Sequence, residues 1–267
     1  MSEQLRALSG LVFASIVALT SLACGDTDNV VPAETAGASG SSGNSAGGTA
    51  GASGSMQAGE ALVWDAQGFV APDANPFGIQ GPFYSYSDCD PPSGLPCTAP
   101  DPSLTGTDGK PGWSASATQV CLKGTAVKVE GSMFAAQWGA GLALDLNSEG
   151  GEPGAPAAKG TFDLVRAGIS GFSVDLSGSA PARIRINLTM PGVEDSSFVD
   201  ATVPGTTTFS TGDTKQGSWV MSKTPLDPTK IEAMQFQVFT NATSPTPFDF
   251  CVNAIRALSS STTASGG

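Results

Sequence analysis

The chain has 267 residues, of which 24 are acidic, 12 are basic and none is histidine. The absence of histidine excludes Ser-His-Asp and Cys-His nucleophiles and every histidine-ligated metal site. The formal net charge of −12 argues against nucleic acid as a partner, because phosphates require a basic surface. Residues 60–267 hold 20 of the acids and 11 of the bases, so the acidity belongs mostly to the part that is expected to fold.

Residues 8–23 form an apolar run that is too short for a membrane span and is typical of a secretory signal. Cys24 follows Ser21-Leu22-Ala23, an arrangement that resembles the lipobox of bacterial lipoproteins, in which the cysteine becomes the lipidated first residue. The family prefers Leu where this chain has Ser21. The resemblance implies an exported protein that is lipid-anchored through Cys24 to the outer membrane or cell surface of a Gram-negative bacterium. The alternative is an ordinary signal peptide that is cleaved nearby.

The next segment is almost free of charge and consists largely of Gly, Ser, Ala and Thr. Such a composition cannot bury enough apolar surface to offset the entropy of ordering, so we predict a disordered tether with a mean span of roughly 30 Å. The predicted organisation is a signal peptide over residues 1–23, the tether over 24–60, a folded domain over 61–258 and a disordered tail over 259–267.

Four further cysteines lie in the predicted domain, an even number that fits an exported chain. Four cysteines permit three pairings. Cys89 and Cys97 flank a turn-rich segment in which a local bridge closes easily, and Cys121 would then pair with Cys251 across a long loop. The competing interpretation is a metal site, but the spacing contains no CxxC pair and no histidine is present.

Apolar and polar residues alternate with period two in several short segments, which Gly, Pro, Ser and Asp clusters separate. These segments are residues 142–147, 172–176, 183–190, 234–238 and 248–253. One-sided alternation is typical of antiparallel sheets that pack on one face. We therefore expect an all-β domain, a β-sandwich of jelly-roll topology.

Residues 138–145, 162–163 and 167–174 resemble the middle strands of galactose-binding-like jelly rolls, and most closely the family 11 carbohydrate-binding modules. Residues 183–186, 217–219, 231–236 and 247–250 continue the same order of elements, and residues 78–84 resemble a segment of Gram-negative soil-bacterial lipoproteins. The resemblance implies a noncatalytic domain that binds carbohydrate. The last strand of such modules often carries acidic calcium ligands, whereas this chain has Cys251 to Asn253 there.

Sugar binding uses flat aromatic rings together with planar hydrogen-bonding groups. Tyr84, Tyr86 and Trp113 are the aromatic residues that we expect to be exposed. Trp138 and Trp219 open strand-like segments, and we expect them in the core or at an edge of the sandwich. The polar faces of two alternating segments supply hydrogen-bonding side chains: Arg183, Arg185, Asn187, Gln235 and Gln237. If these stripes share one surface, they form a binding platform. The alternative is an ordinary solvated outer sheet.

Other chemistry has little support. Two acidic pairs, Glu194 with Asp195 and Glu149 with Glu152, lie in predicted loops and carry no catalytic spacing, so we expect no enzyme activity. No nucleotide-binding motif is present. We expect no cofactor, although a structural calcium ion stays open, with Asp65, Asp73 and Asn75 as candidate ligands.

The leading hypothesis is thus a noncatalytic cell-surface lipoprotein that binds polysaccharide or another cell-surface polymer, with a membrane contact through its lipid only and no nucleic acid partner. The alternatives are a structural or adhesive surface protein that makes protein–protein contacts and, more weakly, a glycan-active hydrolase.

Overall fold

A computed structural model describes residues 59–89, 94–148 and 159–259 of the chain. The predicted signal peptide, the lipidation site Cys24, nearly all of the tether, Glu149, Glu152 and the end of the tail lie outside the described residues. Among the residues that are described, no helix is long and apolar enough to cross a membrane.

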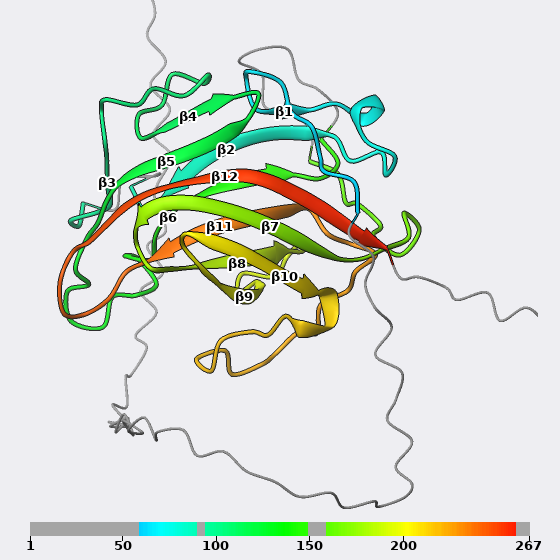
Figure 1. Ribbon diagram of the computed structural model, residues 1–267. Coiled ribbons are helices and arrows are strands. Elements are labelled where there is room, and N and C mark those ends of the chain that lie inside the picture. The colour runs from blue at the N-terminus through cyan, green and yellow to red at the C-terminus, as the bar shows by residue number, and fades with distance from the viewer. Residues whose placement is uncertain (1–58, 90–93, 149–158, 260–267) are drawn as a thin grey trace, which may run out of the picture. The chain divides into compact units, whose positions relative to one another are not determined.

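Two antiparallel sheets form the domain, which confirms the predicted all-β sandwich (Figure 1). The first sheet has the strand order β1-β2-β6-β11-β8-β9. Its strands are β1 (Phe69–Val70), β2 (Gly81–Ser87), β6 (Gly139–Asp145), β11 (Ala233–Phe239), β8 (Arg183–Thr189) and β9 (Ser197–Thr202). The pairs β1–β2 and β8–β9 are consecutive in the sequence, whereas the three central pairings join strands that are far apart in it, as in jelly-roll folds.

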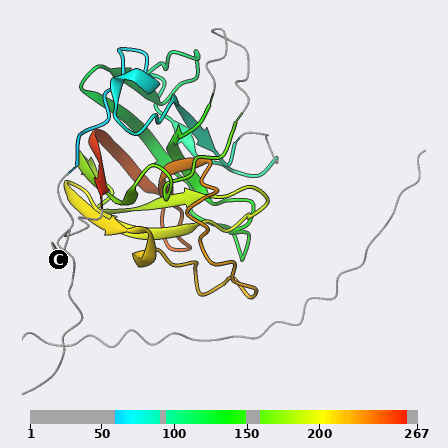
Figure 2. The ribbon, with the colours of Figure 1, turned by 90° about the vertical axis from the view of Figure 1, so that its right-hand side faces the viewer.

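The second sheet has the strand order β10-β7-β12-β5-β3, and β4 also pairs with β5. Its strands are β10 (Gly205–Ser210), β7 (Ile169–Ala180), β12 (Thr246–Ser259), β5 (Gln119–Ala126), β3 (Ala99–Pro100) and β4 (Trp113–Ser116). Two short 3-10 helices, η1 (Pro72–Ala74) and η2 (Thr211–Asp213), lie in the connections. Both views place β1 near one edge of the domain, and β9 and β10, which belong to different sheets, near the other, together with the segment after β10 (Figures 1 and 2).

The core fills the space between the sheets with the apolar half of each alternating strand. In β8 the inward residues are Ile184, Ile186 and Leu188, and in β11 they are Met234, Phe236 and Val238. Burying each such side chain stabilises the fold by roughly 1.5–3 kcal/mol relative to leaving it exposed. Because the period is two, the residues between them must face outward from the sheet.

Strand β12 departs from the simple alternation. Phe248, Phe250 and Val252 are buried, as predicted, but the next core residue is Ile255. The pairing with β7 shifts between Val252 and Ala254, which marks a β-bulge or a similar irregularity at that point. An extra residue in one strand moves every later side chain to the opposite face, and this shift brings Ile255 inward.

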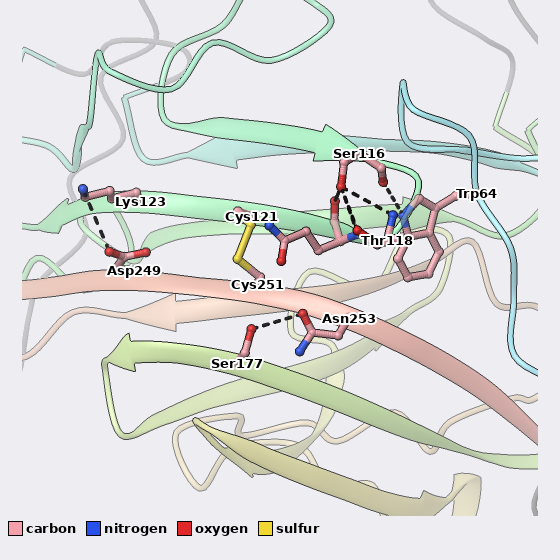
Figure 3. Close-up of a disulfide and its surroundings, with 10 residues drawn as sticks. Trp64, Ser116, Thr118, Cys121, Lys123, Ser177, Asp249, Cys251 and Asn253 are labelled. Atoms are coloured by element: carbon pink, nitrogen blue, oxygen red, sulfur yellow. Dashed lines mark hydrogen bonds and ion pairs between the residues drawn. A yellow bond between two sulfur atoms is a disulfide. The ribbon is translucent and has the colours of Figure 1, made fainter.

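Both predicted disulfides are present. Cys89–Cys97 closes a local loop, and Cys121–Cys251 joins β5 to β12 at positions that are direct cross-strand partners. Figure 3 shows the second bridge between the two strands, with the ion pair of Lys123 and Asp249 to one side of it. This bridge ties an early strand of the domain to the last one across 130 positions of sequence.

Candidate functional site

The outward side chains of the first sheet form two rows that run across five strands. The first row, read from β2 to β9, consists of Tyr84, Ala143, Gln235, Asn187 and Phe198. The second row, one step further along the strands, consists of Tyr86, Gly141, Gln237, Arg185 and Asp200. We call this surface the outer face. It brings together seven of the eight residues that the sequence nominates for ligand binding, since Arg183 also lies on it, opposite Thr202.

One end of the outer face carries a stacked aromatic pair. The rings of Tyr86 and Trp138 have centroids 5.6 Å apart and an angle of 27° between their planes. Trp138 immediately precedes β6, and it is half-buried rather than a core residue, so the expectation that it lies in the core is wrong. The hydroxyl of Tyr86 is buried and has no hydrogen-bond partner. Burial, and secondarily the nearby Tyr84, raise the pKa of Tyr86 well above its usual value.

Tyr84 belongs to a compact polar cluster beside this pair. Its hydroxyl donates to Oδ1 of Asp145 at 3.2 Å and accepts a hydrogen bond from Nζ of Lys159 at 2.5 Å. Lys159 also forms an ion pair with Asp145 at 3.3 Å, and its ammonium group lies 4.5 Å from the centroid of the Tyr84 ring. These contacts hold the Tyr84 ring in one place on the outer face.

Burial governs the titration of this cluster. It raises the pKa of the Asp145 carboxyl above its usual value, although the charge of Lys159 and the hydrogen bonds from Lys159 and Tyr84 oppose the shift. Burial and the charge of Asp145 raise the pKa of Tyr84. For Lys159, burial alone would lower the pKa, but the interactions with Tyr84 and Asp145 outweigh it and raise the pKa.

The other end of the outer face carries a second aromatic group. Phe198 and Trp219 stack with centroids 6.1 Å apart and an interplanar angle of 11°. The Arg185 guanidinium carbon lies 4.6 Å from the Phe198 ring, 4.8 Å from the Trp219 ring and 4.5 Å from the Phe239 ring. We call Arg185 and these three rings the arginine cage. Trp219 is 55% exposed, so its expected place in the core is also wrong.

Amide side chains occupy the middle of the outer face. Asn187 is nearly buried and donates to Oε1 of Gln237 at 3.4 Å. Gln235 lies beside Asn187 in the first row and is partly exposed. Strand β6 contributes only the small residues Gly141 and Ala143 to the two rows, so the side chains of its neighbours close over it. Amide side chains therefore lie between the aromatic groups at the two ends of the face, and together they offer the groups that sugar hydroxyls and sugar ring faces require.

Arg183 and Asp200 form an ion pair at the edge of the outer face. Arg183 approaches Asp200 at 3.1 Å, and Lys215 approaches the same carboxylate at 3.6 Å. Both cations are largely exposed, so these pairs stabilise the fold little. They nevertheless fix where the Asp200 charge lies, next to the cage.

Trp113 is not part of the outer face. It pairs with Leu122 across β4 and β5, is fully buried in the core, and donates through its indole N–H to Asp108 at 2.9 Å. The prediction that it is exposed is wrong, because the turn around Gly106 packs directly against its indole ring.

Phe198 and Phe239 are the aromatic residues of the outer face that were not predicted from the sequence. The alternation in Met234 to Val238 extends to Phe239 and was the available signal for it.

The candidate calcium ligands near the start of the domain organise loops. One carboxylate oxygen of Asp65 accepts hydrogen bonds from the backbone N–H groups of Gln67 and Phe69. The oxygen of Asn75 accepts from the backbone of Phe77 and Ile79, and its amide nitrogen donates to two carbonyls. Asp73 lies in η1. A calcium ion at these residues stays a prediction.

Elsewhere among the described residues, one group of potential metal ligands comes together at Asp88, Cys89 and Cys97. The two cysteine sulfurs are bonded to each other, and the carboxylate of Asp88 accepts hydrogen bonds from the backbone N–H groups of Thr98 and Gly139. Through these two hydrogen bonds Asp88 connects the disulfide loop to β6, which is a structural role.

Comparison with known proteins returns family 11 carbohydrate-binding modules. The module of a cellulosomal cellulase of Clostridium thermocellum is 14% identical, with a TM-score of 0.39 over 75% of this chain and 96% of that module. A module from the same organism in complex with a β-1,3-1,4-mixed-linked tetrasaccharide is 14% identical, with a TM-score of 0.38 and the same coverage. A third solved structure is 13% identical, with a TM-score of 0.31 over 76% of this chain.

No family model matches the chain, and no curated protein matches it either. At TM-scores below 0.5 these solved structures do not identify equivalent residues in this chain.

Proposed function

We propose that the domain is a noncatalytic module that binds a polysaccharide chain across the outer face of its first sheet. The observation that carries this proposal is the pair of rows across β2, β6, β11, β8 and β9, with a stacked aromatic pair at each end and amides between them.

The dimensions suit an oligosaccharide better than a single sugar. Four strand spacings separate β2 from β9, which gives about 19 Å between the two ends of a row. Trp219 and the Tyr86–Trp138 pair offer ring faces for the apolar sides of sugar rings. Gln235 and Gln237 offer both donors and acceptors for hydroxyl groups in between.

The carboxylates of the outer face support binding rather than hydrolysis. Glycosidases place two carboxyl groups within about 10 Å of each other across the scissile bond. Asp145 on β6 and Asp200 on β9 are separated by three strand spacings across the sheet, about 14 Å, and additionally by four residues along the strands. Each is also held in ion pairs, Asp145 with Lys159 and Asp200 with Arg183 and Lys215. Neither is placed to act with the other on one glycosidic bond.

Binding can be tested with the full chain on a panel of soluble and insoluble polysaccharides by pull-down and affinity electrophoresis. The variants Tyr86→Ala and Trp219→Ala should each weaken retention of the bound polysaccharide. Phe134→Ala is the matched control, because Phe134 is an aromatic residue that is about half exposed and lies outside the two rows. Retention of no polysaccharide at all, with the fold intact, would leave the adhesive alternative as the better one.

We also propose that the chain is exported and lipid-anchored through Cys24, so that the tether holds the binding domain away from the membrane. The support is the apolar run that ends at Cys24 and the uncharged segment after it. Metabolic labelling with a radioactive fatty acid in a bacterial host should mark the wild-type chain and leave Cys24→Ala unlabelled. Labelling that persists in Cys24→Ala would overturn this part of the proposal.

A further inference from the structure

The cationic side chain of the arginine cage has no anionic partner of its own. Arg185 is half-buried, and three aromatic rings contact its guanidinium group. Its Nε is buried without a hydrogen-bond partner. Among the described residues, no carboxylate lies within ion-pair distance of Arg185, whereas Lys159 and Arg183 on the same face each have one.

The carboxylate directly across from Arg185 on β9 is already occupied. Asp200 is the cross-strand partner of Arg185, but it forms ion pairs with Arg183 and Lys215 instead. The charges that act on Arg185 are Asp200, which favours its protonated form, and Arg183, which disfavours it. Arg183 and Lys215 thus share the Asp200 carboxylate, while the Asp195 carboxylate accepts a hydrogen bond from the indole N–H of Trp219 at 3.1 Å, which leaves Arg185 without an ion-pair partner among the described residues.

A neutral sugar would not need this arrangement. Gln235 and Gln237 already supply uncharged donors and acceptors for hydroxyl groups. Taking a guanidinium group partly out of water is costly when no anion compensates it, and burial lowers the pKa of Arg185. A planar guanidinium matches the two oxygens of a carboxylate or the oxygens of a sulfate, and stacking on rings limits how it can turn.

We propose that the outer face takes an acidic polysaccharide, whose carboxylate or sulfate groups bind to Arg185 within the cage of Phe198, Trp219 and Phe239. This inference rests on the proposed function and adds the chemical class of the ligand to it. The aromatic rings then serve twice, because they stack on the sugar and also exclude water around the charged pair, which strengthens the contact.

The test compares acidic polymers with neutral ones on the full chain. The acidic set is polygalacturonate, alginate and hyaluronan for carboxylate, and dextran sulfate for sulfate; the neutral set is dextran, xylan, mixed-linked β-glucan and galactomannan. Methyl-esterified polygalacturonate is the matched ligand, because esterification removes the charge and keeps the sugar backbone. EDTA in all samples prevents calcium from bridging the acidic chains. Isothermal titration calorimetry and affinity electrophoresis measure binding.

We expect at least one acidic polymer to bind, and its uncharged counterpart to bind about 10- to 100-fold more weakly, the usual range for a charge-assisted hydrogen bond. Arg185→Gln should reduce the affinity for the acidic polymer by a similar factor. Arg166→Gln is the control, since Arg166 is exposed and lies outside the outer face. A thermal melt checks that each variant is folded, and the comparison of charged with esterified ligand on the wild-type chain needs no variant.

Two results would overturn the inference while the proposed function stands: binding of neutral polymers only, or equal binding of the charged and esterified chains with no effect of Arg185→Gln. Binding of no polymer in either set would instead overturn the proposed function itself. If only polygalacturonate, alginate or hyaluronan is retained, the arginine cage binds carboxylate. If only dextran sulfate is retained, it binds sulfate.

Discussion

The ring of Tyr86 lies directly over the backbone of Gly141 on the neighbouring strand. A Cβ atom at position 141 would lie 2.4 Å from the Tyr86 hydroxyl oxygen and 2.7 Å from the carbonyl oxygen of Phe236. Both contacts are too short for a Cβ atom. Glycine at position 141 therefore leaves the space that the Tyr86 ring of the Tyr86–Trp138 pair occupies.

Gly141→Ala should therefore displace Tyr86 and cost about 1–3 kcal/mol of stability through overpacking. Polysaccharide binding should weaken more than the loss of stability alone explains, because the stacked pair moves. Denaturant unfolding and calorimetric titration measure the two effects. Gly212→Ala is the control, since a Cβ there would meet only the Ser210 hydroxyl at an ordinary 3.7 Å. Unchanged stability and binding in Gly141→Ala would contradict the close approach.

The two tyrosines of β2 should respond in opposite directions to loss of their hydroxyl groups. Tyr86→Phe removes a buried hydroxyl that has no partner, so we expect a gain of about 1 kcal/mol in stability and unchanged stacking. Tyr84→Phe removes hydrogen bonds to Asp145 and Lys159, so we expect a loss of about 1–2 kcal/mol. Urea unfolding of the two variants side by side provides the measurement. A loss of stability in Tyr86→Phe would mean that its hydroxyl has a partner after all.

The buried carboxyl of Asp145 should make stability depend on pH. Its pKa is raised in the folded chain, so the folded state holds the proton more tightly than the unfolded state does. Its contribution to stability is therefore complete below the unfolded pKa and is lost as the pH rises through the folded pKa. We expect the wild type to lose stability relative to Asp145→Asn as the pH is raised from about 3 to about 7.

Asp227 supplies the opposite case for the same experiment. Hydrogen bonds from Thr229, together with Lys230, lower the pKa of Asp227 to about 2. Its contribution is present above the unfolded pKa and is lost as the pH falls through the folded value. As the pH rises, the melting temperature of the wild type should increase relative to that of Asp227→Asn. Over the same range it should decrease relative to that of Asp145→Asn. Parallel slopes for the two variants would contradict the assigned environments.

The two disulfides should differ in their contribution to stability. Cys121–Cys251 spans 130 positions and Cys89–Cys97 spans 8. On the loop-entropy model the long bridge stabilises by about 5 kcal/mol and the short one by about 2.5 kcal/mol. Replacing both cysteines of each pair by alanine, followed by thermal and denaturant unfolding, should give the larger loss for the 121–251 pair. An equal loss would indicate that native-state effects outweigh the entropy of the unfolded chain.

The alternation of polar and apolar residues in the sequence correctly predicted which strand residues face the core and which face outward. Because side chains alternate along a strand, the sequence by itself established that Arg183, Arg185 and Asn187 face outward while Ile184, Ile186 and Leu188 face the core. The same argument placed Gln235 and Gln237, and an even cysteine count in the predicted domain led to the two disulfides. The assignment of strand faces needs only neighbouring residues, the disulfide pairing needs only the number and spacing of the cysteines, and the structure confirms both.

Tertiary structure alone decided which outward residues meet. The arginine cage joins Arg185 of β8, Phe198 of β9, Phe239 of β11 and Trp219 from the segment that follows η2, and no local pattern relates these four positions. Trp113, which reads as exposed among Gly, Pro and Asp residues, is buried because β4 pairs with β5 and the turn at Gly106 covers its ring. Strand order and loop packing depend on contacts between distant parts of the chain, whereas periodicity reports only the face on which a side chain lies.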